Sequence, residues 1–330
     1  MSVRNYKERL FEALLTMLWR QWTALGIAGQ TAVRATGVVL DPEALLVFSS
    51  GFARYDQRLY DLILDWLQVR SPQINIQRLK ALHAKMAYRD TPSLAYMAAV
   101  AAETDPVRWR KPAADHAAVR HAEPVVLFRD RHDVPEPFIP KVDPLARSYG
   151  WLRNLRRPGR KIVPALPAGT APLLLRMRGL TGISARAETL LILQDSAPCT
   201  VQDISARSGF IWKSIQDVLA ELTAAGLVTV IGGEKRGKRY ALAAPEKLLR
   251  FFELEGWVFP VWPNIFDALG LLWQTAADPR LAEVSATVFA REIQYLADRT
   301  LYEKWRLSAH PAFLKSMPKA PDIPEMLGDL

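Results

Sequence analysis

The 330-residue chain contains only one cysteine, Cys199, and five histidines. A single cysteine excludes an intramolecular disulfide and any zinc site built from several thiolates, and it is typical of a reducing cytosol. Long apolar runs are also missing, because stretches such as 95–102 fall well short of the ~20 residues that cross a bilayer. Glu8 and Glu12 lie in the first predicted helix, where a signal peptide carries no acids. We therefore expect a cytoplasmic protein without a membrane-spanning segment.

Motifs that carry catalysis are missing as well. The chain has no glycine-rich phosphate loop, nucleophile elbow or paired-carboxylate motif, so we expect neither an enzyme nor a cofactor. The pair His116 and His121 and the group at 130–133 contain metal-type ligands. Both lie in a proline-rich stretch with no predicted element to make ligands converge, so a solvated loop is favoured over a metal site. Cys199 lies in a predicted turn, where an inert thiol is favoured over a redox sensor.

Acidic residues are absent from 144–187, although the chain has 34 of them against 43 Lys and Arg. The same stretch contains nine Lys and Arg, a number equal to the net charge of +9 of the whole chain. Five of these form what we call the basic strip: Arg153, Arg156, Arg157, Arg160 and Lys161. Cations without neighbouring acids predict contacts with a nucleic-acid backbone. A solvated linker that binds nothing in particular remains the alternative.

The length predicts about two domains at roughly 150 residues each, and the periodicity predicts a mainly α fold. Apolar residues at helical spacing in 11–22, and N-cap residues such as Asp41, indicate an N-terminal helical domain at 1–104. Eleven of the 23 prolines lie between Pro106 and Pro172. They predict an extended proline-rich connector at 105–172, with a short strand near 125–128.

The segment 173–244 has the clearest pattern of predicted helix starts, helix ends and strands. Ser184 predicts the start of one helix, and Thr200 predicts the N-cap of a second, which ends at Gly209. A third helix is expected at 211–225, followed at 227–242 by two strands joined by a glycine-rich, basic tip. This order is typical of a winged helix-turn-helix domain.

The residues of Gly182–Leu242 resemble the winged-helix domains of ArsR- and MarR-like bacterial transcriptional regulators. The strings that carry the resemblance are Thr200-Val201-Gln202-Asp203-Ile204-Ser205, Ser208-Gly209, Ala224-Ala225-Gly226-Leu227-Val228 and Lys238-Arg239-Tyr240-Ala241-Leu242. The opening string of longer prokaryotic winged-helix proteins, Gly-x-x-Ala-Arg-x-Glu, is matched by Gly182, Ala185, Arg186 and Glu188. The resemblance implies sequence-specific binding of double-stranded DNA as a transcriptional regulator. With one cysteine, the thiolate metal site of some ArsR-like proteins is not expected.

The resemblance places the helix at 211–225 in the major groove and the hairpin on the backbone. The expected base-contacting residues are Trp212, Lys213, Ser214, Gln216 and Asp217, and the expected wing residues are Lys235, Arg236, Lys238 and Arg239. Lys213 suits guanine or phosphate, and Gln216 suits adenine. The Trp212 side chain either contacts the nucleic acid or packs against the domain core. Asp217 repels phosphate unless it accepts from a cytosine amino group, so affinity is expected from the wing and the basic strip.

The segment 245–330 is expected to be helical and to pack or dimerise. The aromatic cluster of Trp257, Phe259, Trp262 and Phe266 is expected in a core rather than around a planar small-molecule effector.

A helix at 280–306, with an apolar stripe from Leu281 to Leu296, suits either packing on the N-terminal helices or dimerisation. Because helix-turn-helix proteins commonly read two half-sites, we expect a homodimer with its two reading helices about 34 Å apart, and hence a pseudo-palindromic DNA site. The alternative function is a protein-interaction module, such as an antitoxin or assembly factor whose winged helix contacts a partner protein. A nucleic-acid-processing enzyme is a further alternative.

Overall fold

The computed structural model describes residues 3–28, 37–117, 123–136, 138–157, 159, 162, 165–196, 198–232, 237–312 and 317–327. Over these residues the chain is mainly helical, with two small two-stranded sheets. The predicted mainly α class is therefore confirmed. None of the helices in these ranges is long and apolar enough to span a bilayer.

The N-terminal part is built from helices and short 3₁₀ turns that share one core. These are α1 (Val3–Ala24), α2 (Pro42–Phe52), η1 (Ala53–Tyr55), α3 (Gln57–Arg70), η2 (Ser71–Gln73), α4 (Ile76–Lys85), α5 (Thr91–Ala102) and α6 (Pro106–Ala117). The side chains of Asp41, Asp56 and Asn75 each accept a hydrogen bond from the N–H three residues on, at 3.1, 3.0 and 3.0 Å. They fix the starts of α2, α3 and α4, as their sequence positions predict.

The segment 105–172 differs from the expected extended connector. Its first residues form α6, which contains Pro112, and its strands β1 (Val125–Val126) and β2 (Trp151–Leu152) pair in parallel around α7 (Pro144–Ser148). The short strand expected near 125–128 is thus confirmed. Trp109 and Trp151 are fully buried, and α6 packs closely on α5. Burial of these large side chains outweighs the backbone hydrogen bonds that proline removes.

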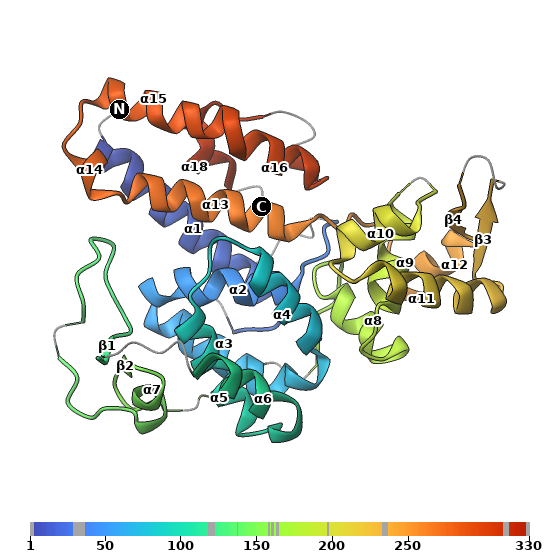
Figure 1. Cartoon of the computed structure of the whole chain (residues 1–330), viewed down its shortest axis with the longest axis horizontal. Helices are drawn as coiled ribbons and strands as arrows, with labels where there is room; N and C mark the ends of the chain where they lie inside the picture. Colours follow the sequence, from blue (N-terminus) through green and yellow to red (C-terminus); the bar gives the residue numbers. More distant parts are fainter. Residues whose placement is uncertain are drawn as a thin grey trace.

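The next part of the chain forms a separate lobe beside the helical body (Figure 1). It contains α8 (Leu173–Thr181), α9 (Arg186–Asp195), α10 (Val201–Ser208), α11 (Trp212–Ala224), β3 (Val228–Ile231), β4 (Arg239–Leu242) and α12 (Pro245–Phe252). The hairpin of β3 and β4 points away from the body, at the end of the molecule farthest from α14 (Figure 1). The lobe therefore presents α11 and the hairpin to the outside.

The chain then returns to the N-terminal helices. This last part contains α13 (Trp262–Ala276), α14 (Pro279–Ala282), α15 (Ala286–Leu296), the π-helical η3 (Ala297–Leu301), α16 (Tyr302–Leu307), η4 (Ala320–Asp322) and α18 (Ile323–Met326). Helix α13 packs on α1 and α2, and the Trp262 indole donates a 2.7 Å hydrogen bond to the Val39 carbonyl. Trp257, Phe259 and Phe266 are buried too, which confirms the core interpretation of this aromatic cluster.

The apolar stripe expected at 281–296 is used within the chain. The helix expected at 280–306 is broken before Ser285, whose side chain caps α15. Phe289 and Ile293 are buried, and the Phe289 ring lies 5.5 Å from that of Tyr6 on α1. Packing within the chain therefore accounts for the centre of the stripe, whereas Val288 stays 46% exposed. The homodimer stays a prediction.

Candidate nucleic-acid interface

Helix α10 and the turn after it are set by local hydrogen bonds. The Thr200 hydroxyl accepts from the Asp203 N–H at 3.1 Å, and the Asp203 carboxylate accepts from the Thr200 N–H at 2.9 Å. The Thr200 N–H and hydroxyl hold the pKa of Asp203 below its ordinary value. Gly209 ends α10 with φ +79°, a conformation that favours glycine. The start and end that the sequence predicts for this helix are confirmed.

Helix α11 has one buried and one exposed face. Ile215, Leu219 and Leu222 are buried, as expected from their spacing, and Val218 joins them. This face packs on α9, α10 and β3. No described segment covers the opposite face, so its side chains are open to a partner.

The expected base-contacting residues lie on this exposed face. Trp212 is 60% exposed, so it does not plug the core, and Gln216 is exposed as well. Ser214 is half-buried. Lys213 pairs with Asp217 at 2.9 Å, and both side chains are largely exposed. The carboxylate of Asp217 is thus partly neutralised on the same face.

The hairpin is tied to the start of α10. Val228 pairs with Leu242 and Ile231 with Arg239 in an antiparallel register, and Tyr240 exchanges backbone hydrogen bonds with Cys199 at 3.0 and 2.8 Å. Burial raises the pKa of the Cys199 thiol, so it stays protonated at neutral pH.

Two of the four expected wing residues are described. Lys238 and Arg239 are exposed, and the Arg239 guanidinium donates to the Pro198 carbonyl at 2.9 Å. Lys235 and Arg236 lie outside the described residues. The described part of the hairpin therefore offers two cations to solvent.

The basic strip requires a correction. Arg153 is 0% exposed and binds both carboxylate oxygens of Asp61 on α3, at 2.6 and 3.0 Å. The Arg156 side chain is almost fully buried and pairs with Asp65 at 2.7 Å. Neither guanidinium reaches a nucleic-acid backbone, because α3 supplies the counter-ions that the local sequence lacks.

The other three residues of the basic strip are not shown to be buried in ion pairs. Arg157 is exposed, and Arg160 and Lys161 lie outside the described residues. Of the other cations in the acid-free stretch, Arg178 is buried in ion pairs and Arg186 pairs with Glu221 on α11. The stretch 144–187 is therefore not one continuous phosphate-binding surface.

A buried ionic cluster, made of Asp41, Glu43, Arg78, Arg178 and Glu188, joins the lobe to the N-terminal helices. Arg178 contacts Glu43 at 2.5 Å and Glu188 at 2.5 Å, and Arg78 contacts Glu43 at 2.7 Å and also pairs with Asp41. Burial alone raises the pKa of Asp41, but Arg78 outweighs it and holds the pKa below its usual value. Glu188 is the last residue of the Gly-x-x-Ala-Arg-x-Glu string, so this string has a structural role at the junction.

The cluster also reaches the turn before α11. The Arg78 Nε donates a 2.7 Å hydrogen bond to the carbonyl of Ser208, the last residue of α10. A fully buried arginine on α4 thus fixes the end of α10. The exposed face of α11 has a set orientation relative to the N-terminal helices. Sequence reasoning missed Arg78, because its partners lie more than 30 residues away.

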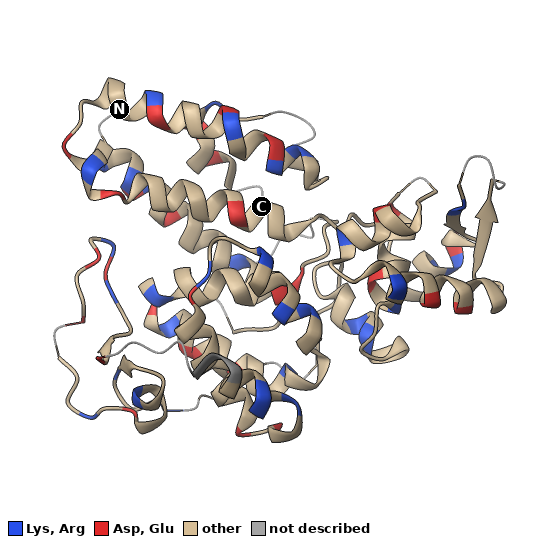
Figure 2. Ribbon diagram, viewed as in Figure 1, with Lys and Arg blue, Asp and Glu red and all other residues tan. Residues whose placement is uncertain are grey.

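Charges of both signs are spread over the lobe (Figure 2). The described residues contain no group of three or more His, Cys, Asp or Glu side chains able to hold a metal ion. In the loop at 130–133, the Asp130 carboxylate accepts from the backbone N–H of His132 and Val134, at 2.8 and 2.9 Å. Asp133 pairs with Arg129 at 2.9 Å. These contacts stabilise a turn.

A comparison of the chain with protein-family models, with curated proteins and with solved structures finds no match.

Proposed function

We propose that the chain is a winged helix-turn-helix protein that binds double-stranded DNA and regulates transcription. In this proposal α11 enters the major groove and the β3–β4 hairpin contacts the adjacent backbone. The observation that carries it is the exposed face of α11, which includes Lys213, Gln216 and Asp217, in the lobe from which the hairpin projects. Figure 1 shows α11 and the hairpin at this end of the molecule. A major groove about 12 Å wide accommodates one helix.

The chemistry of this face suits base contacts more than strong phosphate binding. The exposed amide of Gln216 has the donor and acceptor that pair with adenine. Lys213 must leave Asp217 to contact a base, which costs little, because an exposed i,i+4 pair stabilises by only about 0.3–0.5 kcal/mol. Asp217, once released, can accept from a cytosine amino group.

Backbone affinity is then expected mainly from the hairpin. Lys238 and Arg239 are exposed there, and Lys235 and Arg236 lie between the two strands in the sequence. Burial of Arg153 and Arg156 removes two cations from the contacts first expected. The salt dependence of binding should therefore be shallow, with a log-log slope of up to ~0.9 per phosphate contact.

The test begins with selection of duplexes from random DNA by the immobilised full chain. Gln216→Ala should then weaken binding to the selected site about 5- to 150-fold, which corresponds to about 1–3 kcal/mol, and leave a scrambled duplex unaffected. Lys238→Ala should weaken both duplexes to a similar extent. Gln77→Ala, an exposed glutamine on α4, is the matched control and should change neither.

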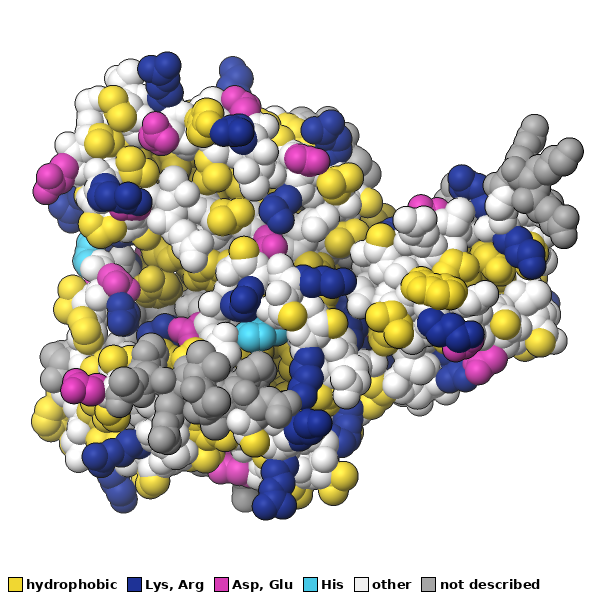
Figure 3. All heavy atoms as spheres, viewed as in Figure 1, with side chains coloured by type: hydrophobic (Ala, Val, Ile, Leu, Met, Phe, Trp, Pro, Cys, Tyr) yellow, Lys and Arg dark blue, Asp and Glu magenta, His cyan; other side chains and the backbone are white. Residues whose placement is uncertain are grey.

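A second candidate is a protein-interaction module. Exposed apolar side chains favour it, since Ile211, Trp212 and Ile231 lie on the surface of the lobe and Figure 3 shows hydrophobic groups gathered there. An apolar groove of about 280 Å³ also lies between Leu227 and Phe251. If wild-type protein shows no salt-dependent duplex binding, or if Gln216→Ala weakens both duplexes equally, the DNA proposal fails and this candidate takes its place.

A further inference from the structure

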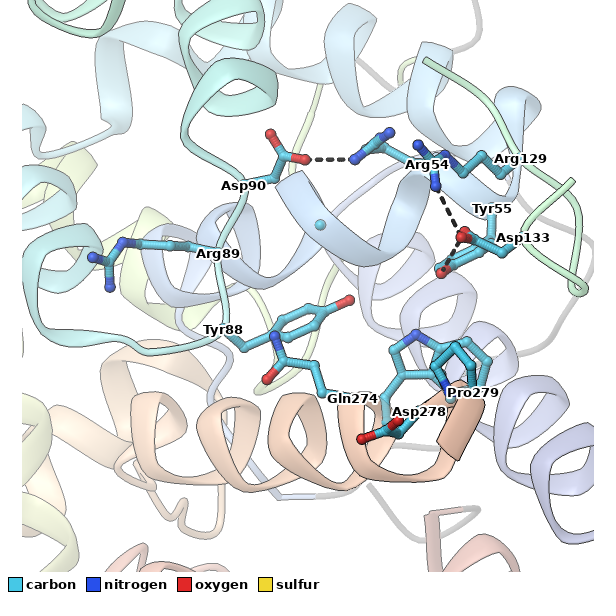
Figure 4. A pocket seen from close by; sticks show the side chains of 13 residues that line it. Arg54, Tyr55, Tyr88, Arg89, Asp90, Arg129, Asp133, Gln274, Asp278 and Pro279 are labelled. Atoms are coloured by element: carbon cyan, nitrogen blue, oxygen red, sulfur yellow. Dashed lines mark hydrogen bonds and ion pairs between the residues drawn. The ribbon is translucent and has the colours of Figure 1, made fainter. Parts of the chain in front are cut away.

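A cavity of about 410 Å³ lies in the helical body, away from α11 and the hairpin. Four segments that are distant in the sequence form it: the end of α2 with η1, the residues before α5, the loop at 129–133, and the junction of α13 and α14 (Figure 4). Its lining residues include Arg54, Tyr55, Tyr88, Arg129, Trp273 and Gln274. Pockets of roughly 300–1,000 Å³ are the usual size for small-molecule sites. The proposed function makes no use of this cavity.

Aromatic rings supply the apolar part of the wall. Tyr55 and Trp273 stand almost perpendicular, with ring centroids 5.6 Å apart and an interplanar angle of 81°. Tyr88 faces Tyr55 across the cavity (Figure 4). Trp273 is only 3% exposed and also packs on Phe11 and Phe52, so the half-buried Tyr55 supplies more of the open aromatic surface. Stacking on an aromatic face stabilises a bound planar ring.

The Tyr88 hydroxyl is the polar group in the cavity that could bind a ligand. Tyr88 is only 7% exposed, and among the described residues its hydroxyl has no hydrogen-bond partner. The hydroxyl points toward the middle of the cavity (Figure 4). Burial raises the pKa of Tyr88, so the group stays protonated and can donate. An unpartnered hydroxyl at the wall of a cavity can donate to a bound molecule without breaking an existing hydrogen bond.

Two glycines leave the space that Tyr88 occupies, because a side chain at either position would collide with it. A Cβ added at Gly270 on α13 would lie 2.1 Å from the Tyr88 Cβ, and one added at Gly51 on α2 would lie 3.0 Å from its ring. The Tyr88 ring also packs on Phe48, with centroids 5.2 Å apart. The hydroxyl is therefore presented by a fixed ring and not by a mobile side chain.

Five of the six charged lining residues form ion pairs. Arg54 pairs with Asp90 at 2.5 Å, and Arg129 pairs with Asp133 at 2.9 Å. Asp278 pairs with Arg280 at 2.6 Å.

The last charged lining residue, Arg89, extends away from the other lining residues (Figure 4) and donates to the Met86 carbonyl. The lining carries three Arg and three Asp residues, so its formal charges balance, which favours a guest without net charge.

We propose that this cavity binds an uncharged planar heteroaromatic molecule of nucleobase or nucleoside size. The guest lies against Trp273 and Tyr55 and accepts a hydrogen bond from Tyr88 at a ring nitrogen or an exocyclic oxygen. The exposed amide of Gln274 supplies one donor and one acceptor for the edge of the same ring.

The test is isothermal titration calorimetry of the full chain with adenine and adenosine as probes. Ribose is the control without an aromatic ring, and adenosine monophosphate is the charged control. Tyr88→Phe removes only the hydroxyl and should weaken binding about 3- to 10-fold. Tyr295→Phe, an exposed tyrosine on α15 outside the cavity, is the matched control and should leave binding unchanged.

A second variant tests the location. Gln274→Trp places a bulky ring in the cavity from an exposed helix position, so it should abolish binding without lowering the melting temperature. The proposal is overturned if neither uncharged probe binds at millimolar concentration, if Gln274→Trp binds as wild type does, or if the monophosphate binds more tightly than the nucleoside. Loss of duplex binding has no bearing on this result, because the two sites share no residue.

Discussion

Replacement of Arg178 by methionine should strongly destabilise the protein. The guanidinium is fully buried, with contacts to Glu43 at 2.5 and 2.9 Å and to Glu188 at 2.5 Å. In Arg178→Met, Glu43 keeps its contact with Arg78, but Glu188 is left without a partner among the described residues. Removal of one partner from a buried pair costs about 3–5 kcal/mol, so the free energy of unfolding should fall by that amount.

Substitutions at Glu188 distinguish the loss of the ion pair with Arg178 from the cost of leaving the Glu188 carboxylate buried without a partner. The buried ionic cluster has three carboxylates against two guanidiniums, so Glu188→Gln removes an excess negative charge and should cost only about 1 kcal/mol. The double variant Arg178→Met with Glu188→Met should be more stable than Arg178→Met alone, because no carboxylate remains unpaired at position 188.

Urea denaturation followed by circular dichroism measures these differences. Arg157→Met, at an exposed position, is the control and should change stability by less than about 0.5 kcal/mol. A cost below about 1 kcal/mol for Arg178→Met, or a double variant no more stable than Arg178→Met alone, would refute the account of the cluster.

Two other predictions use the same measurement. Burial lowers the pKa of His310 to about 4, so the folded state favours the neutral ring and the unfolded state takes up the proton first. Stability should therefore fall as the pH drops from about 6.5 to about 4, by up to about 1.4 kcal/mol per pH unit, and His310→Phe should remove this part of the dependence. An unchanged pH profile in that variant would contradict the assignment. Arg153→Gln should cost about 2–3 kcal/mol because it breaks the pair with Asp61, whereas Arg157→Gln should cost almost nothing. If Arg153→Gln instead leaves stability intact and flattens the salt dependence of duplex binding, the arginine contacts the nucleic acid after all.

The features that the sequence predicts well are those determined within a few residues. Asp41, Thr200 and Gly209 fix helix ends through groups at most four positions away, so their roles follow from residue type and spacing. The same local pattern separates the two faces of α11. The local pattern does not show whether another segment covers the outer face. It therefore leaves both a core position and an exposed position open for Trp212, which is 60% exposed in the structure.

Features that depend on distant segments could not be predicted. The acid-free stretch at 144–187 suggests free cations, but Arg153 finds Asp61, which is 92 residues away, and Arg178 finds Glu43, which is 135 residues away. The cavity beside Tyr88 has the same origin, because its walls come from four separate segments. One sequence gives the charge and shape of each side chain but not its neighbours in space.

The return of the C-terminal helices to α1 and α2 has a consequence for synthesis on the ribosome. Trp262 donates to the carbonyl of Val39, 223 residues earlier, and Tyr6 donates to that of Ala320, 314 residues later. The N-terminal helices are therefore made long before the residues that complete their core, and their apolar faces stay uncovered while the lobe with α11 is translated. Completion of this core must follow the synthesis of α13 and α18, and a chain that stops after the hairpin would present the surfaces of α1 and α2 to chaperones or to aggregation.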